Sequence, residues 1–149
     1  MAESCAECGA PLPVGATCRD LFYELLVMEG AIAGAPGSIL HFYAVASYNL
    51  QHPAGSGLTA EVYHSSRLAL ADALDGRARL EDLLRRARRA TDGPTRVLRR
   101  AGDPLPEQAH AGWTTTVADV LAARPATYDA YAEVVVGWAR SVREARDAG

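Results

Sequence analysis

The chain has no lysine, and it has only three cysteines and two residues each of methionine, tryptophan and phenylalanine. The absence of lysine, beside abundant alanine, arginine and glycine, indicates the codon usage of a GC-rich bacterium. No apolar run approaches the roughly 20 residues that a membrane-spanning helix needs, so we expect no membrane partner. Residues 1–11 lack the basic start and the apolar core of a signal peptide, and we therefore expect a cytoplasmic protein.

Charge gives no general reason to expect a nucleic-acid partner. The net charge is −3 at pH 7 over 149 residues, which does not favour binding to nucleic acid or to an anionic membrane. Nine of the fifteen arginines nevertheless lie in residues 77–100, where Arg79, Arg86 and Arg89 can share one helical face. Acidic residues dilute this face and no nucleic-acid-binding motif accompanies it, so we interpret it as a solvated helix surface.

Apolar periodicity predicts helices along most of the chain, while strand patterns do not exceed a few residues. We expect helices near residues 18–30, 39–52, 59–75, 77–91, 116–123 and 128–146, with Thr17, Ser38 and Thr59 as N-caps. The predicted fold is therefore all-α, an irregular bundle of five to six helices. With 49% hydrophobic residues, the chain can form one core, and we expect a single domain spanning residues 1–149.

Residues 93–113 interrupt this pattern with three prolines and three glycines. They predict a long connection, either a loop throughout or a short helix at Thr95–Arg100 between two loops. A loop of this length is unusual in a compact domain unless it is functional or held against the core. His110, within this stretch, is expected to be a solvated loop residue.

The segment HFYAVASYNLQHP, residues 41–53, places polar side chains on an otherwise apolar helix. His41, Val45, Tyr48 and His52 follow one another at i, i+4, i+7 and i+11 and therefore share one stripe of the helix. Pro53 ends the helix, because the residue before a proline avoids helical geometry. Buried polar groups need partners, so we expect the rest of the chain to supply them.

The three cysteines predict a zinc site. Cys5 and Cys8 form a Cys-x-x-Cys-Gly turn, which is half of a zinc knuckle and gives residues 1–16 a reason to be ordered. Cys18 follows ten residues later, at the start of the first helix. In a reducing compartment this usage indicates metal or thiol chemistry rather than a disulfide framework.

A histidine is expected to complete the site, since three thiolates and one imidazole form a recognised structural zinc set. His41 and His52 lie about 16 Å apart along a helix, so one ion cannot bind both. If the first two helices are antiparallel, the start of the first, at Cys18, lies beside the end of the second, at His52. We therefore predict His52 as the fourth ligand, with His41 as the alternative.

Helical spacing predicts a second polar cluster. Antiparallel packing of the first three helices would place Glu24, Tyr48 and His64 at a similar height in the core. These groups could perform acid–base chemistry or hold a second metal; alternatively they form a satisfied polar network that fixes the packing. The same geometry makes Glu29 and His41 neighbours at the far end, with the same two interpretations.

Together these motifs resemble those of an uncharacterised bacterial family, a domain of unknown function. The resemblance covers nearly the whole chain and rests on the ordered cysteine, histidine and Gln51-His52-Pro53 motifs. It implies that the family's cysteine positions fall on Cys5, Cys8 and Cys18. Its histidine positions fall on His41, His52 and His64, and its glutamate falls on Glu24. Family members often have proline where this chain has Ala6, and typically an acidic residue where Ser47 stands, so a carboxylate role is absent there.

Two functions follow as hypotheses. The leading one is a small cytoplasmic zinc-binding protein whose Cys3His site is structural, because four protein ligands leave no open position for water. A pocket between the first three helices would then bind a small molecule or a protein partner. The alternative is a metal-dependent or acid–base enzyme of a bacterial biosynthetic pathway that uses Glu24, Tyr48 and His64 as catalytic residues.

Overall fold

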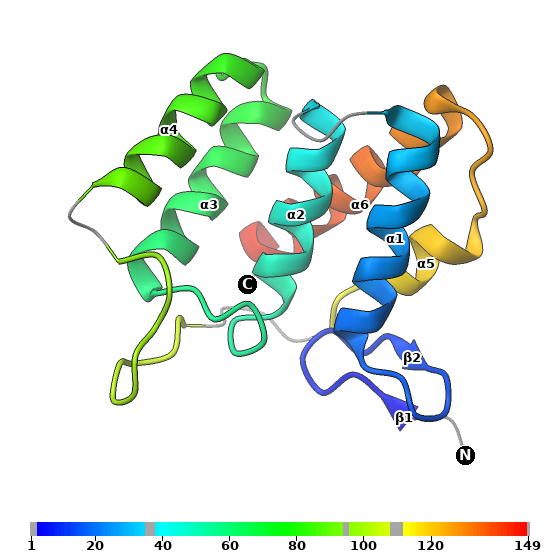
Figure 1. The fold of residues 1–149 in the computed structure, drawn as a ribbon, viewed down its shortest axis with the longest axis horizontal. Coiled ribbons are helices and arrows are strands. Elements are labelled where there is room, and N and C mark those ends of the chain that lie inside the picture. The colour runs from blue at the N-terminus through cyan, green and yellow to red at the C-terminus, as the bar shows by residue number, and fades with distance from the viewer. Residues whose placement is uncertain (1–2, 35–37, 94–95, 108–111, 149) are drawn as a thin grey trace.

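The computed structural model describes residues 3–34, 38–93, 96–107 and 112–148, and helices dominate this part of the chain (Figure 1). The elements are, in order, β1 (Glu3–Ser4), β2 (Pro11–Leu12), α1 (Cys18–Ala33), α2 (Ile39–Gln51), α3 (Ala60–Leu74), α4 (Leu80–Asp92), α5 (Val117–Ala122) and α6 (Tyr128–Ala148). The all-α prediction is confirmed, with a two-residue antiparallel hairpin, β1–β2, as an addition. None of the described helices is long and apolar enough to cross a membrane.

The helices begin at the residues that local capping chemistry favours. Thr17 and Asp20 form a reciprocal capping box at the start of α1. The hydroxyl of Ser38 accepts a hydrogen bond from the backbone N–H of His41, and Thr59 caps α3 in the same way. The three predicted N-caps are therefore confirmed, and the first of them fixes where Cys18 sits.

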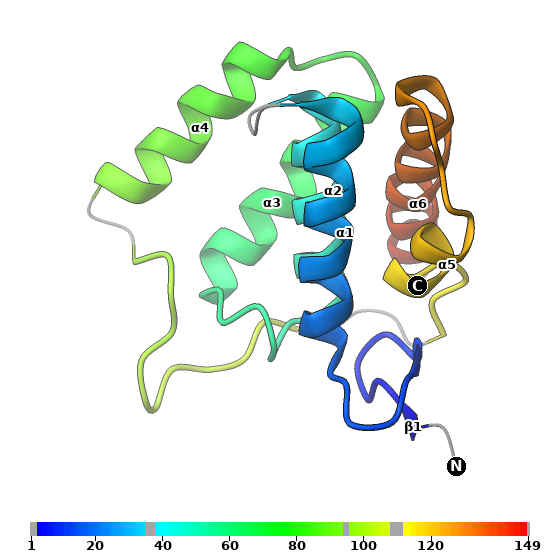
Figure 2. The ribbon, with the colours of Figure 1, turned by 45° about the vertical axis from the view of Figure 1, so that its right-hand side comes forward.

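Helix α2 is the centre of the bundle. It packs most extensively against α6, and it lies between α1 and α3, with which it also makes contact (Figures 1 and 2). Its fully buried residues include Ala44, Ser47 and Gln51, at i, i+3 and i+7. The predicted stripe is confirmed at Tyr48 and His52, which are buried, whereas Val45 and His41 are only half-buried. The fully buried stripe is displaced from it by one residue, or about 100°. The difference arises because α6 covers a face of α2 that the local sequence does not identify.

Polar contacts fix α2 against its distant neighbours. The indole N–H of Trp138, on α6, donates to the side-chain oxygen of Gln51 at 3.2 Å. The side-chain nitrogen of Gln51 donates in turn to the carbonyl oxygen of Thr115 at 2.7 Å. Since Gln51 and Trp138 are both fully buried, these bonds satisfy groups that would be costly to leave unpaired.

The connection after α4 is an extended segment held against the loop before α3, and the alternative of a helix is wrong for residues 96–100. The backbone N–H of Thr59 donates to Val97, and that of Arg99 donates to Gly57. The Arg99 guanidinium also donates to three carbonyl oxygens of the facing loop, at 2.6 to 2.8 Å, which belong to Pro53, Ala54 and Leu58. These bonds explain how a long connection is held in place. His110 lies outside the described residues.

Candidate metal centre

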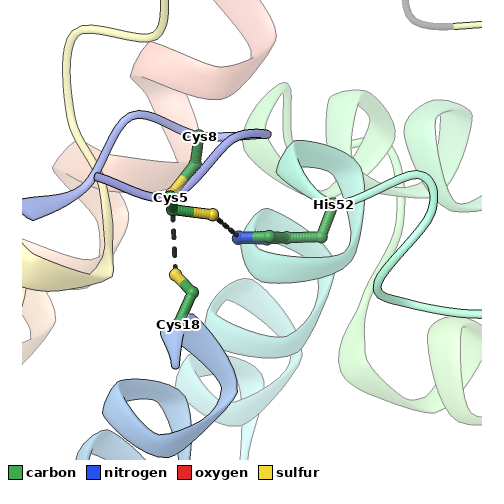
Figure 3. A group of neighbouring side chains, drawn as sticks. All are labelled: Cys5, Cys8, Cys18 and His52. Atoms are coloured by element: carbon green, nitrogen blue, oxygen red, sulfur yellow. Dashed lines mark hydrogen bonds between the residues drawn. The ribbon is translucent and has the colours of Figure 1, made fainter. Parts of the chain in front are cut away.

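Four side chains meet where the hairpin, the start of α1 and the end of α2 come together (Figure 3). Cys5 and Cys8 belong to the turn of the hairpin, Cys18 is the first residue of α1, and His52 follows the last residue of α2. Helices α1 and α2 run antiparallel, as Figure 1 shows, so the start of one lies beside the end of the other. The predicted grouping of these four residues is confirmed.

The hairpin turn aims its cysteines through backbone hydrogen bonds. The N–H of Cys5 donates to the carbonyl of Ala10 at 2.8 Å, and the N–H of Gly9 donates to the carbonyl of Cys5 at 2.9 Å. The N–H of Ala10 points to the sulfur of Cys8 at 3.4 Å. Gly9 has a φ of 82°, which glycine adopts without the steric cost that other residues incur.

Two separations between ligand atoms match a tetrahedral metal site, and all four atoms are close enough to share one ion. All four lie within 4.8 Å of one another. The sulfur of Cys5 is 3.6 Å from Nε2 of His52, and the sulfurs of Cys8 and Cys18 are 3.6 Å apart. Bonds of about 2.3 Å to sulfur and about 2.0 Å to nitrogen put tetrahedral ligand atoms about 3.8 Å apart for two sulfurs and about 3.5 Å for sulfur and nitrogen.

His52 is oriented for metal binding by its second nitrogen. Nδ1 lies 2.6 Å from the carbonyl oxygen of Tyr48, and since a carbonyl can only accept, Nδ1 carries the proton. Nε2 therefore presents its lone pair to the sulfurs, which is the arrangement that metal-binding histidines commonly show. The imidazole also stacks on the Tyr48 ring, at 4.0 Å, and that ring stacks on Phe22. The alternative ligand, His41, bonds instead to Glu29.

Glu7, between the two hairpin cysteines, fastens the hairpin to the loop after α2. Its carboxylate accepts the backbone N–H groups of Ala54 and Gly55, at 3.1 and 2.8 Å. The guanidinium of Arg19 donates to the carbonyl of Gly55 at 2.6 Å. Sequence reasoning missed Glu7, because its partners are backbone groups about 47 residues away that carry no sequence signal.

Electrostatics in the cluster favour a bound cation. The contact between the sulfurs of Cys8 and Cys18 lowers the pKa of Cys8 against the opposing effect of burial. The same contact, together with burial, raises the pKa of Cys18. Two sulfurs this close favour a bound cation, because a divalent ion would stabilise both as thiolates. Burial raises the pKa of Tyr48 to about 12, so the neighbouring phenol stays neutral.

The predicted convergence of Glu24, Tyr48 and His64 in the core is wrong. Glu24 and His64 are both exposed, and they lie on helices that α2 separates. Nδ1 of His64 accepts a hydrogen bond from Arg67 on its own helix at 3.1 Å. Sequence spacing predicts how far along its helix each group lies, but not the side of the helix on which it points. The rotation of α1 and α3 directs Glu24 and His64 outward. A catalytic role for these residues stays a prediction without a shared cavity to support it.

The predicted contact between Glu29 and His41 is confirmed. Nδ1 of His41 lies 2.7 Å from the Glu29 carboxylate. The phenol of Tyr131, on α6, donates to the other carboxylate oxygen at 2.6 Å, a partner that sequence reasoning missed. Burial and this bond both raise the pKa of Tyr131. The arrangement is a satisfied buried network that joins α1, α2 and α6.

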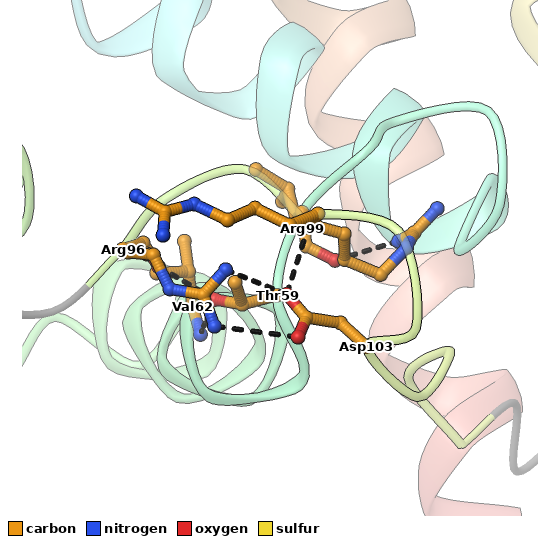
Figure 4. A network of polar contacts seen from close by, with 7 residues as sticks. Thr59, Val62, Arg96, Arg99 and Asp103 are labelled. Atoms are coloured by element: carbon orange, nitrogen blue, oxygen red, sulfur yellow. Dashed lines mark hydrogen bonds and ion pairs between the residues drawn. The ribbon is translucent and has the colours of Figure 1, made fainter.

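Several arginines of residues 77–100 are engaged in ion pairs within the protein. Arg85 pairs with Asp82, and Arg86 pairs with Asp72 on α3. After α4, Arg96 pairs with Asp103 at 2.7 Å (Figure 4). These pairs agree with the interpretation of a solvated surface stabilised locally.

A groove of about 690 Å³ separates α3 from α4. Its apolar residues include Phe42, Leu58, Val62, Ala69, Leu83 and Val97, and its polar and charged residues include Asn49, Glu61, Ser66, Asp72, Arg86 and Arg89. The sequence predicts a pocket between the first three helices. This groove is a different one, because α4 forms one of its walls.

Comparison with family models gives one match. A model of a family of unknown function, DUF5946, matches residues 3–147, nearly the entire chain. The resemblance to a domain of unknown function is therefore confirmed. Comparisons with curated proteins and with solved structures gave no match.

Proposed function

The chain belongs to DUF5946, a family of unknown function, and we propose that this protein binds one Zn²⁺ ion through Cys5, Cys8, Cys18 and His52. The observation that carries the proposal is the spacing of the ligand atoms, because both 3.6 Å separations lie close to the edges of a zinc tetrahedron. The N–H of His52 is already directed away from the sulfurs.

The ligand chemistry favours zinc among the common metal ions. Thiolates select soft or borderline ions over Mg²⁺ and Ca²⁺, which prefer oxygen ligands. Three sulfurs and one nitrogen in a tetrahedron match the structural zinc sites of proteins. With all four positions filled by the chain, no position remains for water or substrate, and this supports a structural rather than a catalytic ion.

The structural role follows from what the four ligands join. Two-residue strands contribute little stability by themselves, and an isolated hairpin is marginal in water. A metal bound to Cys5 and Cys8 on the hairpin, Cys18 on α1 and His52 after α2 links three segments at one point. Because the unfolded chain lacks such a preformed site, the binding free energy contributes directly to folding.

Metal analysis of the purified chain tests this proposal. We expect one equivalent of zinc per chain, and we expect Cys8→Ser to lose most of it together with thermal stability. Leu105→Ser is a suitable control, because Leu105 is 60% exposed and remote from the four ligands in the chain. Less than half an equivalent of zinc, unchanged by Cys8→Ser, would contradict the proposal.

The groove between α3 and α4 favours a second function, the binding of a small amphipathic anion. Its volume lies within the range of small-molecule sites, and its lining is mainly apolar. Arg86 is neutralised by Asp72, whereas Arg89 has no carboxylate within ion-pair distance among the described residues. An apolar body along the groove with a carboxylate at Arg89 would complement these features.

Decanoate is a suitable probe for this second function. We expect binding that is measurable by calorimetry below 1 mM and several-fold weaker in Arg89→Ala. Arg88→Ala is the matched control, since Arg88 lies one position away and does not line the groove. Equal binding of decyltrimethylammonium, or equal loss in both variants, would show that Arg89 does not recognise the anion.

A further inference from the structure

We propose that Cys5 is an oxidant-reactive site, at which a hydroperoxide starts formation of a Cys5–Cys8 disulfide and release of the metal. This inference rests on the proposed zinc site and adds a means of regulating it. It depends on three features of the cluster: unequal exposure of the three cysteine residues, a recess that opens on the hairpin, and short distances between the sulfur atoms.

The three cysteines differ in exposure. Cys8 and Cys18 are 3% and 6% exposed, whereas Cys5 is only half-buried. Oxidation of a metal-bound or free thiolate requires access for the oxidant, so the reaction is expected to begin at the most accessible sulfur. Among the three, Cys5 is the most exposed residue, so we expect the reaction to begin there.

A recess of about 390 Å³ leads to the hairpin face of the cluster. It is bounded by the hairpin turn on one side and by the segment before and within α5 on the other, including Trp113, Thr116 and Asp119. Cys5 and Cys8 line it, while Cys18 and His52 do not. Since a water molecule occupies about 30 Å³, the recess can admit hydrogen peroxide, which is only slightly larger.

The first chemical step oxidises Cys5. Its thiolate attacks one oxygen of hydrogen peroxide, so that a sulfur–oxygen bond forms and the oxygen–oxygen bond breaks. Hydroxide leaves and is protonated to water. The product is a sulfenic acid at Cys5, whose sulfur no longer binds the metal as a thiolate.

The second step is capture of the sulfenic acid by Cys8. The thiolate of Cys8 lies within 4.8 Å of the Cys5 sulfur and lines the same recess. Its attack forms the sulfur–sulfur bond, breaks the sulfur–oxygen bond and releases a second hydroxide, which becomes water. In total two thiolates lose two electrons and one peroxide gains them.

The disulfide leaves the metal with Cys18 and His52 alone. Two ligands do not hold zinc as four do, so the ion dissociates. The hairpin then remains attached to the loop after α2 through Glu7, but it loses its link to the start of α1. The reaction thereby converts an oxidant signal into metal release and local loosening of the chain.

The test uses the full zinc-loaded chain and stoichiometric hydrogen peroxide. Zinc release is followed with a chromogenic chelator, early sulfenic acid is trapped with dimedone, and the products are mapped by mass spectrometry. We expect one zinc released per chain, dimedone on Cys5 at early times, a Cys5–Cys8 disulfide at the end, and recovery with dithiothreitol and zinc.

A matched pair of variants tests the role of the recess. Ala6 is exposed and lines the recess, so Ala6→Trp should slow release several-fold while zinc content stays at one equivalent. Val14→Trp places the same side chain at a residue that is 90% exposed and outside the recess, and it should leave the rate unchanged.

The outcomes separate the two proposals. Absence of zinc before any oxidant is added would overturn the zinc site itself and this inference with it. Full zinc loading followed by no release, by first oxidation at Cys18, or by equal rates in both variants would overturn only the reactive-cysteine inference.

Discussion

Nδ1 of His52 donates a hydrogen bond to the backbone carbonyl of Tyr48 at 2.6 Å, and the rings of the two residues stack. The tyrosine thus fixes both the tautomer and the direction of the imidazole before any metal is bound. A helix end with this geometry presents Nε2 as a ready ligand, and the Cys-x-x-Cys hairpin supplies sulfurs at matching distances.

The two histidines of α2 offer a direct comparison. We expect His52→Gln to lose most of the bound zinc and to lower the thermal midpoint, because a ligand is removed. His41→Gln should keep the zinc, since His41 bonds to Glu29 near the opposite end of the helix. The zinc content per chain, measured by atomic emission, checks both variants. Loss of zinc in His41→Gln and not in His52→Gln would contradict His52 as the ligand.

High pH is expected to destabilise the fold through two buried tyrosines. Burial raises the pKa of Tyr48 to about 12, and burial with the Glu29 contact raises the pKa of Tyr131. A raised pKa favours the neutral phenol in the folded state, so this stability is fully present below pH 10 and is lost as the pH rises above it.

Denaturation midpoints between pH 9 and pH 12 measure this effect. The decline above pH 10 should be smaller in Tyr131→Phe than in the unmodified chain, because phenylalanine does not ionise. Tyr128→Phe is the control, since Tyr128 is 47% exposed. An identical decline in all three proteins would mean that Tyr131 does not contribute.

Arg99 is expected to stabilise the long connection after α4. Its guanidinium bonds to three loop carbonyls, and charged hydrogen bonds contribute more than neutral ones. Arg99→Ala should therefore lower the free energy of unfolding by about 2–3 kcal/mol. Arg100→Ala, at the adjacent exposed arginine, should change it by less than about 0.5 kcal/mol. Urea denaturation of the two variants gives the comparison, and equal effects would show that the carbonyl contacts contribute little.

The metal cluster was predictable because its signals are local. Thr17 fixes the start of α1, Pro53 fixes the end of α2, and the Cys-x-x-Cys-Gly turn needs only adjacent residues. Antiparallel packing of two helices joined by a short loop then brings Cys18 beside His52. Each of these inferences depends either on residues that are close in the sequence or on the length of a helix. Sequence periodicity specifies both well.

The rotation of the helices was not predictable in the same way. The buried face of α2 depends on α6, and the Gln51–Trp138 bond joins residues 87 positions apart. Tyr131 reaches Glu29 across 102 positions. Spacing along the chain gives the height of Glu24 and His64 on their helices, but the direction of each side chain depends on these distant contacts.

X-ray absorption at the zinc edge of the purified chain tests the central claim most directly. The account predicts a first shell of three sulfur atoms at about 2.3 Å and one nitrogen at about 2.0 Å. A shell made of oxygen and nitrogen alone, or one with fewer than two sulfurs, would contradict it.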